Sequence, residues 1–118
     1  GTPDAYKNDH KILLFMEMAV DQYIDNYNAS EKMFVLMPYQ HSENIEEQLK
    51  GVEMLKEQID KEQDMSQKNI LKTALHHQKG HLNVQKKFDR FPKRNYILGR
   101  LSTEDEIDYM DRSENVPY

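Results

Sequence analysis

The chain has 118 residues, which is enough for one domain with a real but modest core. Its formal net charge of -5 at pH 7 argues against a general nucleic-acid binder, which would carry a basic face. It contains no cysteine, so disulfides and thiolate metal sites are excluded. Hydrophobic residues make up only 37% of the chain, which is lean for a domain that buries its core alone.

No targeting segment is visible at the start of the chain. The longest apolar stretch, residues 12–20, is interrupted by Glu17 and is far shorter than the roughly 20 residues that cross a bilayer. We therefore expect a soluble chain without membrane insertion, located in the cytoplasm, with an organelle not excluded. No cofactor is expected.

The first element in chain order is a helix that starts at Thr2 and Pro3, a good cap followed by a good first helical residue. It is expected to continue to about Tyr27. Its apolar residues cover more than one stripe, which indicates burial against several neighbours. A second, short helix is predicted over residues 31–37, capped by Ser30 and stopped by Pro38.

A third helix is predicted to begin near Ser42 or Asn44, with apolar residues at spacings of three and four along one face. After a polar turn, a fourth helix capped by Ser66 is expected to reach Phe88 and to pair with the third in antiparallel fashion. No segment shows the alternation of a strand. The predicted fold is all-α, with about five helices.

The last helix is predicted to start at Ser102 or Thr103, because Thr103 and Glu106 have the spacing of a capping box. We expect a single helical domain over residues 1–110 and a frayed tail over residues 111–118.

The stretch 88–100, FDRFPKRNYILGR, is the part of the chain richest in specific chemistry. Pro92 should end the preceding helix and force a turn. Four cations then lie close together: Arg90, Lys93, Arg94 and Arg100. They could converge on a carboxylate or phosphate. The alternative is that they bind helix carbonyls and neighbouring carboxylates and hold a corner of the fold.

A second polar cluster, His41, Ser42 and Glu43, lies at a loop-to-helix junction, where a helix N-terminus could hold an anion. A Ser beside a His in sequence does not make a catalytic dyad, so Ser42 could equally be a cap. His77 and His81 are one helical turn apart and are weak candidates for a metal pair, completed by His41 or Glu43. Core histidines are the commoner outcome on such a face.

Two motifs together, PYQHSEN at 38–44 and FDRFPKRNYILGRLST at 88–103, resemble the bacterial family catalogued as domain of unknown function 924. His81 stands where that family carries a His seven residues before the first Phe. Asp89 replaces a family Gly, and Lys93 replaces a usual His. The resemblance implies a helical fold similar to tetratricopeptide superhelices. It covers residues 1–110.

The opening Gly-Thr-Pro resembles the middle of that family, and the motif Asp-Gln-Phe-Pro-Arg-Asn of its earlier helices is absent. We therefore expect the chain to be the C-terminal portion of a longer family domain. Either the missing N-terminal helices or a protein partner would then complete it.

Two functions are considered, and the sequence favours the first. The first is a non-catalytic interaction or structural module that binds a protein partner. The second is a small-anion binding protein or enzyme, in which His41 or Glu43 acts as acid or base. The predicted ligand-binding set is His41, Ser42, Glu43, His81, Arg90, Arg94, Asn95 and Arg100. The separation of His41 from Arg94 discriminates between the two functions.

Overall fold

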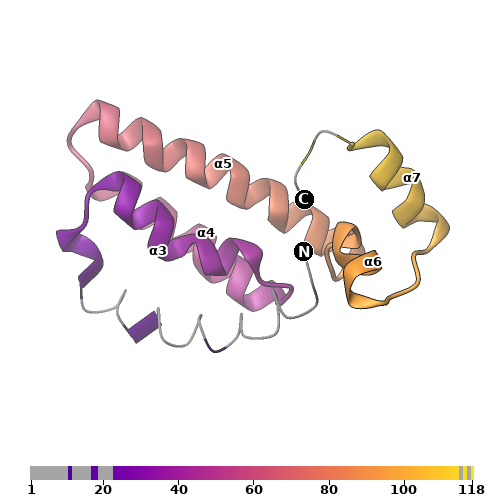
Figure 1. Cartoon of the computed structure of the whole chain (residues 1–118). Helices are drawn as coiled ribbons and strands as arrows, with labels where there is room; N and C mark the ends of the chain where they lie inside the picture. Colours follow the sequence, from indigo (N-terminus) through magenta and orange to yellow (C-terminus); the bar gives the residue numbers. More distant parts are fainter. Residues whose placement is uncertain (1–10, 12–16, 19–22, 115, 117) are drawn as a thin grey trace.

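The computed structural model describes residues 11, 17–18, 23–114, 116 and 118, and over these residues it contains helices and no β-strand (Figure 1). The all-α prediction is confirmed. The predicted start of the first helix at Thr2 and Pro3, and most of its length, lie outside the described residues. Its expected end near Tyr27 is a short 3-10 helix, η1 (Ile24–Asn26).

Helix α3 (Ala29–His41) starts earlier than predicted because Asn28, and not Ser30, is its cap. The Asn28 side chain accepts a hydrogen bond from the backbone N–H of Glu31. The Glu31 carboxylate in turn accepts one from the N–H of Asn28. This reciprocal pair satisfies two donors that a helix start otherwise leaves free.

The predicted end of this helix at Pro38 is wrong, because the helix continues through Pro38 to His41. Proline removes one helical hydrogen bond and crowds the preceding turn. Leu36 and Tyr39, on either side of it, are only 2% and 1% exposed. Their burial against the other helices outweighs the local cost of the proline.

Helices α4 (Ile45–Lys61) and α5 (Met65–Phe88) form the predicted antiparallel pair, and α3 packs against both (Figure 1). The Asn44 side chain caps α4, so of the two expected starts, Ser42 and Asn44, the second is the one found. The cap of α5 is Asp64, which accepts from the N–H groups of Ser66 and Gln67. Ser66 is thus inside the helix and does not cap it.

The core between these three helices is apolar, but it also contains buried glutamine side chains. The spacing of apolar residues in the sequence did not predict their burial. Its buried apolar residues are Ala29, Leu36, Tyr39, Leu55, Ile59, Leu71 and Ala74. The buried glutamines are Gln48, Gln58, Gln78 and Gln85. A buried amide is costly unless hydrogen-bonded, so these side chains need defined partners.

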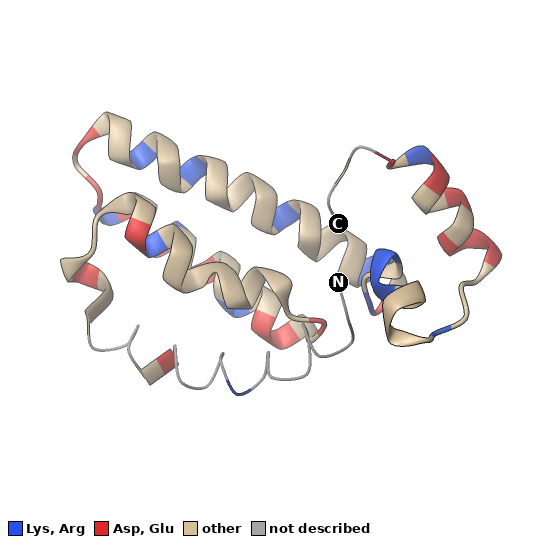
Figure 2. Cartoon of the chain, viewed as in Figure 1, with Lys and Arg blue, Asp and Glu red and all other residues tan. Residues whose placement is uncertain are grey.

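Beyond α5 the chain turns sharply into a corner made of η2 (Pro92–Arg94) and α6 (Asn95–Leu98), followed by α7 (Glu104–Arg112). Thr103 and Glu106 form the predicted capping box at the start of α7. Figure 2 shows acidic residues along α7 and basic residues at η2. Across the corner, Arg90, just before η2, forms an ion pair with Glu106 of α7.

A frayed tail was expected from Asp111 onward. In the structure, α7 includes Asp111 and continues through Arg112. The Tyr118 ring lies 4.2 Å from the His81 ring, centroid to centroid. The Lys93 ammonium donates to the backbone carbonyls of Ser113 and Val116. Within the described part of the chain, no helix is long and apolar enough to span a membrane.

Replacing Gly51 with alanine should destabilise the fold, because helices α3 and α4 touch there. A Cβ at Gly51 would lie 2.7 Å from the Cβ of Tyr39 and 3.3 Å from the Gln78 amide. We expect a loss of about 1–3 kcal/mol in the free energy of unfolding, measured by urea denaturation, despite alanine's better helix propensity. The control Glu53→Ala, at an exposed position of α4, should change it by less than about 0.5 kcal/mol. Equal stabilities for the two variants would contradict the close approach.

Candidate anion-binding site

Buried glutamine side chains position the loop after α3. The Gln48 amide N–H group donates to the carbonyls of Gln40 and Ser42, at 2.6 and 2.7 Å. Gln78 donates to the Gln48 amide oxygen at 2.7 Å, and Gln85 donates to the carbonyl of Glu43. The last carbonyls of a helix have no partner within it, so these amides supply one and hold the loop in place.

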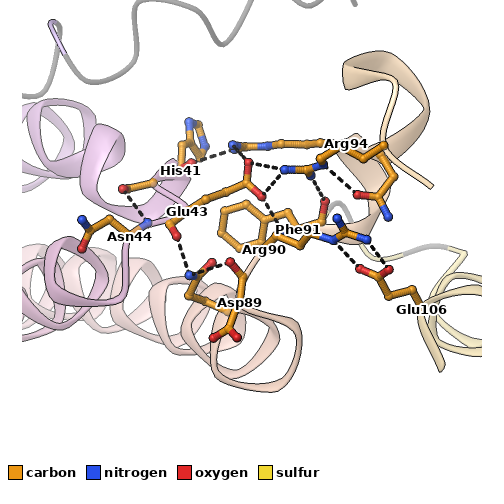
Figure 3. Close-up of polar contacts among 12 residues, drawn as sticks. His41, Glu43, Asn44, Asp89, Arg90, Phe91, Arg94 and Glu106 are labelled. Atoms are coloured by element: carbon orange, nitrogen blue, oxygen red, sulfur yellow. Dashed lines mark hydrogen bonds and ion pairs between the residues drawn. The ribbon is translucent and has the colours of Figure 1, made fainter. Parts of the chain in front are cut away.

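Glu43 joins this loop to the corner after α5 (Figure 3). Its Oε2 accepts from the backbone N–H of Phe91 at 2.9 Å and from the Arg100 guanidinium at 3.0 Å. A nitrogen of Arg94 lies 3.6 Å from Oε1. The carboxylate is thus committed to internal partners that come from the opposite side of the corner.

Arg100 and Asn95 complete this arrangement. Arg100 also donates to the Asn95 side-chain oxygen at 2.9 Å and to the carbonyl of Phe91 at 3.1 Å. Asn95, which is 1% exposed, donates to the hydroxyl of Ser102 at 3.1 Å. Both side chains therefore hold the backbone of the corner.

Arg90 makes a two-point contact with Glu106 of α7, at 2.8 and 2.6 Å, and a third bond to the carbonyl of Leu101 at 2.8 Å. These hydrogen bonds from Arg90 lower the pKa of Glu106 to about 2. The reading in which arginines hold a corner of the fold therefore describes Arg90 and Arg100, and Arg94 shares it through its contacts with Glu43 and with the carbonyl of His41.

A cavity of about 370 Å³ lies beside this corner. It is lined by Gln40, His41, His81, Phe91, Lys93, Arg94 and Tyr118. The Arg94 guanidinium donates to the carbonyl of His41 at 2.8 Å and lies 4.7 Å from the centre of the Phe91 ring. His41 and Arg94 thus line one cavity, as the anion-site hypothesis requires of these two residues.

The charged side chains that line the cavity, Lys93 and Arg94, are both cationic. Burial lowers the pKa of Lys93, because desolvation is a cost to its charged form even though the ammonium donates to the carbonyls of Ser113 and Val116. An anion in the cavity would relieve this cost.

His81 is the most buried titratable group at the cavity, at 7% exposure. Its Nδ1 lies 2.9 Å from the carbonyl of His77. Burial, with smaller contributions from the positive charges of His41 and Arg94, lowers its pKa to about 4. The imidazole is therefore neutral at pH 7.

The remaining predicted residues do not face a ligand together. Ser42 donates to Glu47 and accepts from the N–H of Asn44, so it serves the start of α4. His77 is exposed and stands edge-on to His76. Among the residues that the structure describes, no three His, Asp or Glu side chains are grouped to hold a metal ion.

The cavity therefore brings together His41, His81 and Arg94 from the predicted ligand-binding set. Glu43, Arg90, Asn95 and Arg100 are engaged in contacts within the corner. The cavity is also lined by residues outside the predicted ligand-binding set: Gln40, Phe91, Lys93 and Tyr118. Lys93 belonged to the basic stretch and could have been included on its charge, whereas nothing in the sequence indicated Tyr118.

A family model described as "Bacterial protein of unknown function (DUF924)" matches residues 1–114. The chain belongs to this family. A solved structure, the protein of unknown function ATU0120 from Agrobacterium tumefaciens, is similar to it with a TM-score of 0.79 and 24% sequence identity. The similarity covers 96% of this chain and 58% of that one, and it shows the fold alone. No curated protein sequence matched.

This DUF924 chain has Asp89 where the family resemblance places a glycine. The backbone at this corner gives a physical reason for that glycine. Asp89 caps α5 with a φ of 59°, in the left-handed region that glycine adopts most readily. The Gln85 side chain donates to its carbonyl at 3.1 Å. Aspartate is among the residues that tolerate this conformation, so the turn is retained.

Replacing Glu43 with glutamine should destabilise this DUF924 chain, because the amide offers one acceptor oxygen in place of a charged carboxylate with three partners. We expect a loss of about 2 kcal/mol in the free energy of unfolding, measured by urea denaturation. The control Glu46→Gln, exposed in the first turn of α4, should lose only a few tenths. A Glu43→Gln variant as stable as the control would show that the carboxylate does not hold the corner.

The neutral His81 predicts a pH dependence of stability. Between pH 6.5 and about 4 the unfolded chain binds a proton at His81 that the folded chain does not, so stability falls as the pH falls through this window. The change reaches at most about 3 kcal/mol. His81→Gln should remove this component, as judged from urea denaturation at several pH values. An unchanged pH dependence in that variant would contradict a buried, neutral imidazole.

Proposed function

We propose that this DUF924 chain binds a small anion, a phosphate or carboxylate group, in the cavity between the end of α3 and the corner after α5. The observation that supports this most is the charge of the cavity: both of its charged lining side chains, Lys93 and Arg94, are cations, and two imidazoles lie beside them. Arginine offers a planar fork of donors that fits phosphate and carboxylate.

The size of the cavity suggests more than a free ion. At about 370 Å³ it falls at the lower end of the range of ligand pockets, roughly 300–1,000 Å³. The aromatic side chains of Phe91 and Tyr118 add apolar wall to the cationic part. An anionic group on a small organic molecule suits this mixture better than inorganic phosphate alone.

The internal ion pairs support the same proposal indirectly. Glu43 is held by Arg100 and by the N–H of Phe91, so it pins the backbone just before Lys93 and Arg94. A cationic site that is positioned before the ligand arrives loses less free energy on binding. These bonds favour a structural role for Glu43 over the role of acid or base.

Inorganic phosphate should bind to the wild-type chain, and the Arg94→Met variant should bind it at least tenfold more weakly, a change of about 1.4 kcal/mol. The measurement is a chemical-shift titration of the ¹⁵N-labelled protein at low salt, because salt screens such contacts. The matched control is Lys86→Met, which removes an exposed cation of α5 outside the cavity and should leave the affinity unchanged.

Two results would overturn the proposal. One is a wild-type chain whose spectrum does not respond to phosphate. The other is equal phosphate affinity of the Arg94→Met and Lys86→Met variants. Phosphate binding would then depend on the net charge of the protein and not on Arg94.

A protein-interaction module remains the second candidate, supported by exposed apolar residues on the corner. Tyr96 and Leu101 are 95% and 92% exposed, and Phe34 on α3 is 65% exposed. Exposed apolar groups of this size are typical of contact surfaces. The tetratricopeptide-like superhelix and completion of the chain by further helices remain predictions that accompany this candidate.

A further inference from the structure

Residues that follow α7 return to the anion cavity and contact it at two places. The Lys93 ammonium, which lines the cavity, donates to the backbone carbonyls of Ser113 and Val116. The Tyr118 ring also lines the cavity, and its centroid lies 4.2 Å from that of the His81 ring. These interactions, called the tail contacts below, therefore occupy a cation and part of the wall that a ligand would use.

The Tyr118 ring fits at this position because residue 80 of α5 is a glycine. A Cβ added to Gly80 would lie 2.5 Å from Cζ and 3.0 Å from Cε2 of Tyr118, and closer still to its hydroxyl oxygen. Carbon atoms in contact are about 3.5–4.0 Å apart. A side chain at position 80 would therefore displace the ring. Glycine weakens a helix interior relative to alanine, and the approach of Tyr118 gives this one a structural role.

The tail contacts can open while the helices stay folded. Val116 and Tyr118 are only partly buried. One further bond fastens this segment, since the Tyr109 hydroxyl of α7 donates to the Tyr118 carbonyl at 2.6 Å. Segments held by few buried contacts open locally at a lower free energy than the core. Displacement of Tyr118 is therefore a local change.

An anion in the cavity competes with the tail for Lys93. The tail offers this ammonium two backbone carbonyls, which carry no net charge. An anion offers acceptor oxygens as well as an opposite charge, and hydrogen bonds between two charged groups are the stronger kind. The anion is therefore the better partner for Lys93, and its binding favours release of the tail contacts.

We propose that the tail contacts inhibit the anion site from within the chain, an inference that rests on the proposed function. In the closed form, Tyr118 lies against Gly80 and Lys93 is bound to the tail carbonyls. In the open form, Tyr118 has left and Lys93 binds the anion. A site that is open for only a fraction of the time binds its ligand with an affinity reduced by that fraction.

The open form keeps the other parts of the site. Phe91 directly precedes η2, and Arg94 is its last residue. The Glu43 carboxylate holds this backbone through its bond to the N–H of Phe91. None of these residues belongs to the tail contacts. Release of Tyr118 thus removes one aromatic wall and leaves the other beside the two cations.

The test is the Gly80→Ala variant of the full chain, which excludes the Tyr118 ring while every residue that lines the cavity is kept. We expect it to bind inorganic phosphate about threefold to tenfold more tightly than the wild-type chain, in a chemical-shift titration at low salt. Tyr118→Ala should have the same effect. The matched control is Asn83→Ala, at an exposed position of α5 outside the cavity, where alanine also raises helix propensity. Its affinity should be unchanged.

Release of the tail is measured in the wild-type chain, so it does not depend on the folding of a variant. The contact between the Tyr118 and His81 rings should give nuclear Overhauser effects between their protons in the free protein. We expect these signals to disappear at saturating phosphate. In the Gly80→Ala variant they should be absent from the start.

The outcomes separate this inference from the proposed function. Phosphate binding that leaves the Tyr118–His81 signals intact would overturn inhibition by the tail and leave the anion site standing. Weaker binding by Gly80→Ala and Tyr118→Ala would also overturn it, because the ring would then help to hold the ligand. Equal affinities of Gly80→Ala and Asn83→Ala would do the same. No phosphate binding by either the wild-type chain or Gly80→Ala would overturn both proposals.

Discussion

The carboxylate of Glu43 links two parts of the chain that are far apart in sequence. It lies on the loop between α3 and α4, and its strongest partners are the backbone N–H of Phe91 and the guanidinium of Arg100. A partly buried carboxylate is stable only when such donors surround it. The Arg94 guanidinium of η2 adds a second link, because it donates to the carbonyl of His41 at the end of α3.

This link divides the four cations of the corner into two groups. Arg90 and Arg100 are bound to carboxylates and carbonyls, and they maintain the path of the chain from α5 to α7. Lys93 and Arg94 line the cavity, although Lys93 also donates to the carbonyls of Ser113 and Val116. Arg94 also donates to the carbonyl of His41 and pairs with the Glu43 carboxylate. The structural reading of the basic stretch therefore describes Arg90 and Arg100, whereas the proposed ligand-binding role falls on Lys93 and Arg94, a few positions away.

The sequence predicted the parts that depend on local chemistry. The amphipathic spacing of α4 and α5 and the Thr103–Glu106 capping box could be identified from neighbouring residues, and the start of α4 could be narrowed to Ser42 or Asn44. It failed at Pro38, where tertiary burial of Leu36 and Tyr39 overrides a local rule. The proximity of His41, His81 and Arg94 could only be hypothesised. The basis for the hypothesis was that the motifs at 38–44 and 88–103 are both rich in polar residues.

Other features of the site depend on contacts that no local pattern encodes. Gln48 and Gln85 look like ordinary polar helix residues, yet each is buried and bonded to the loop that carries Glu43. The sequence could not show that Arg90 pairs with Glu106, because α7 contains several acidic residues. In the structure, Glu106 is the acidic residue of α7 that is buried. Long-range hydrogen bonds of this kind become visible only once the helices are placed.

The division of the arginines is the central claim, and the side-chain Nε–H signals of the arginines test it most directly. In a titration of the ¹⁵N-labelled chain with phosphate, we expect the Arg94 signal to shift while those of Arg90 and Arg100 stay in place. Shifts at Arg90 or Arg100 with an unaffected Arg94 would contradict the account, because the residues assigned to hold the corner would then be those that bind the anion.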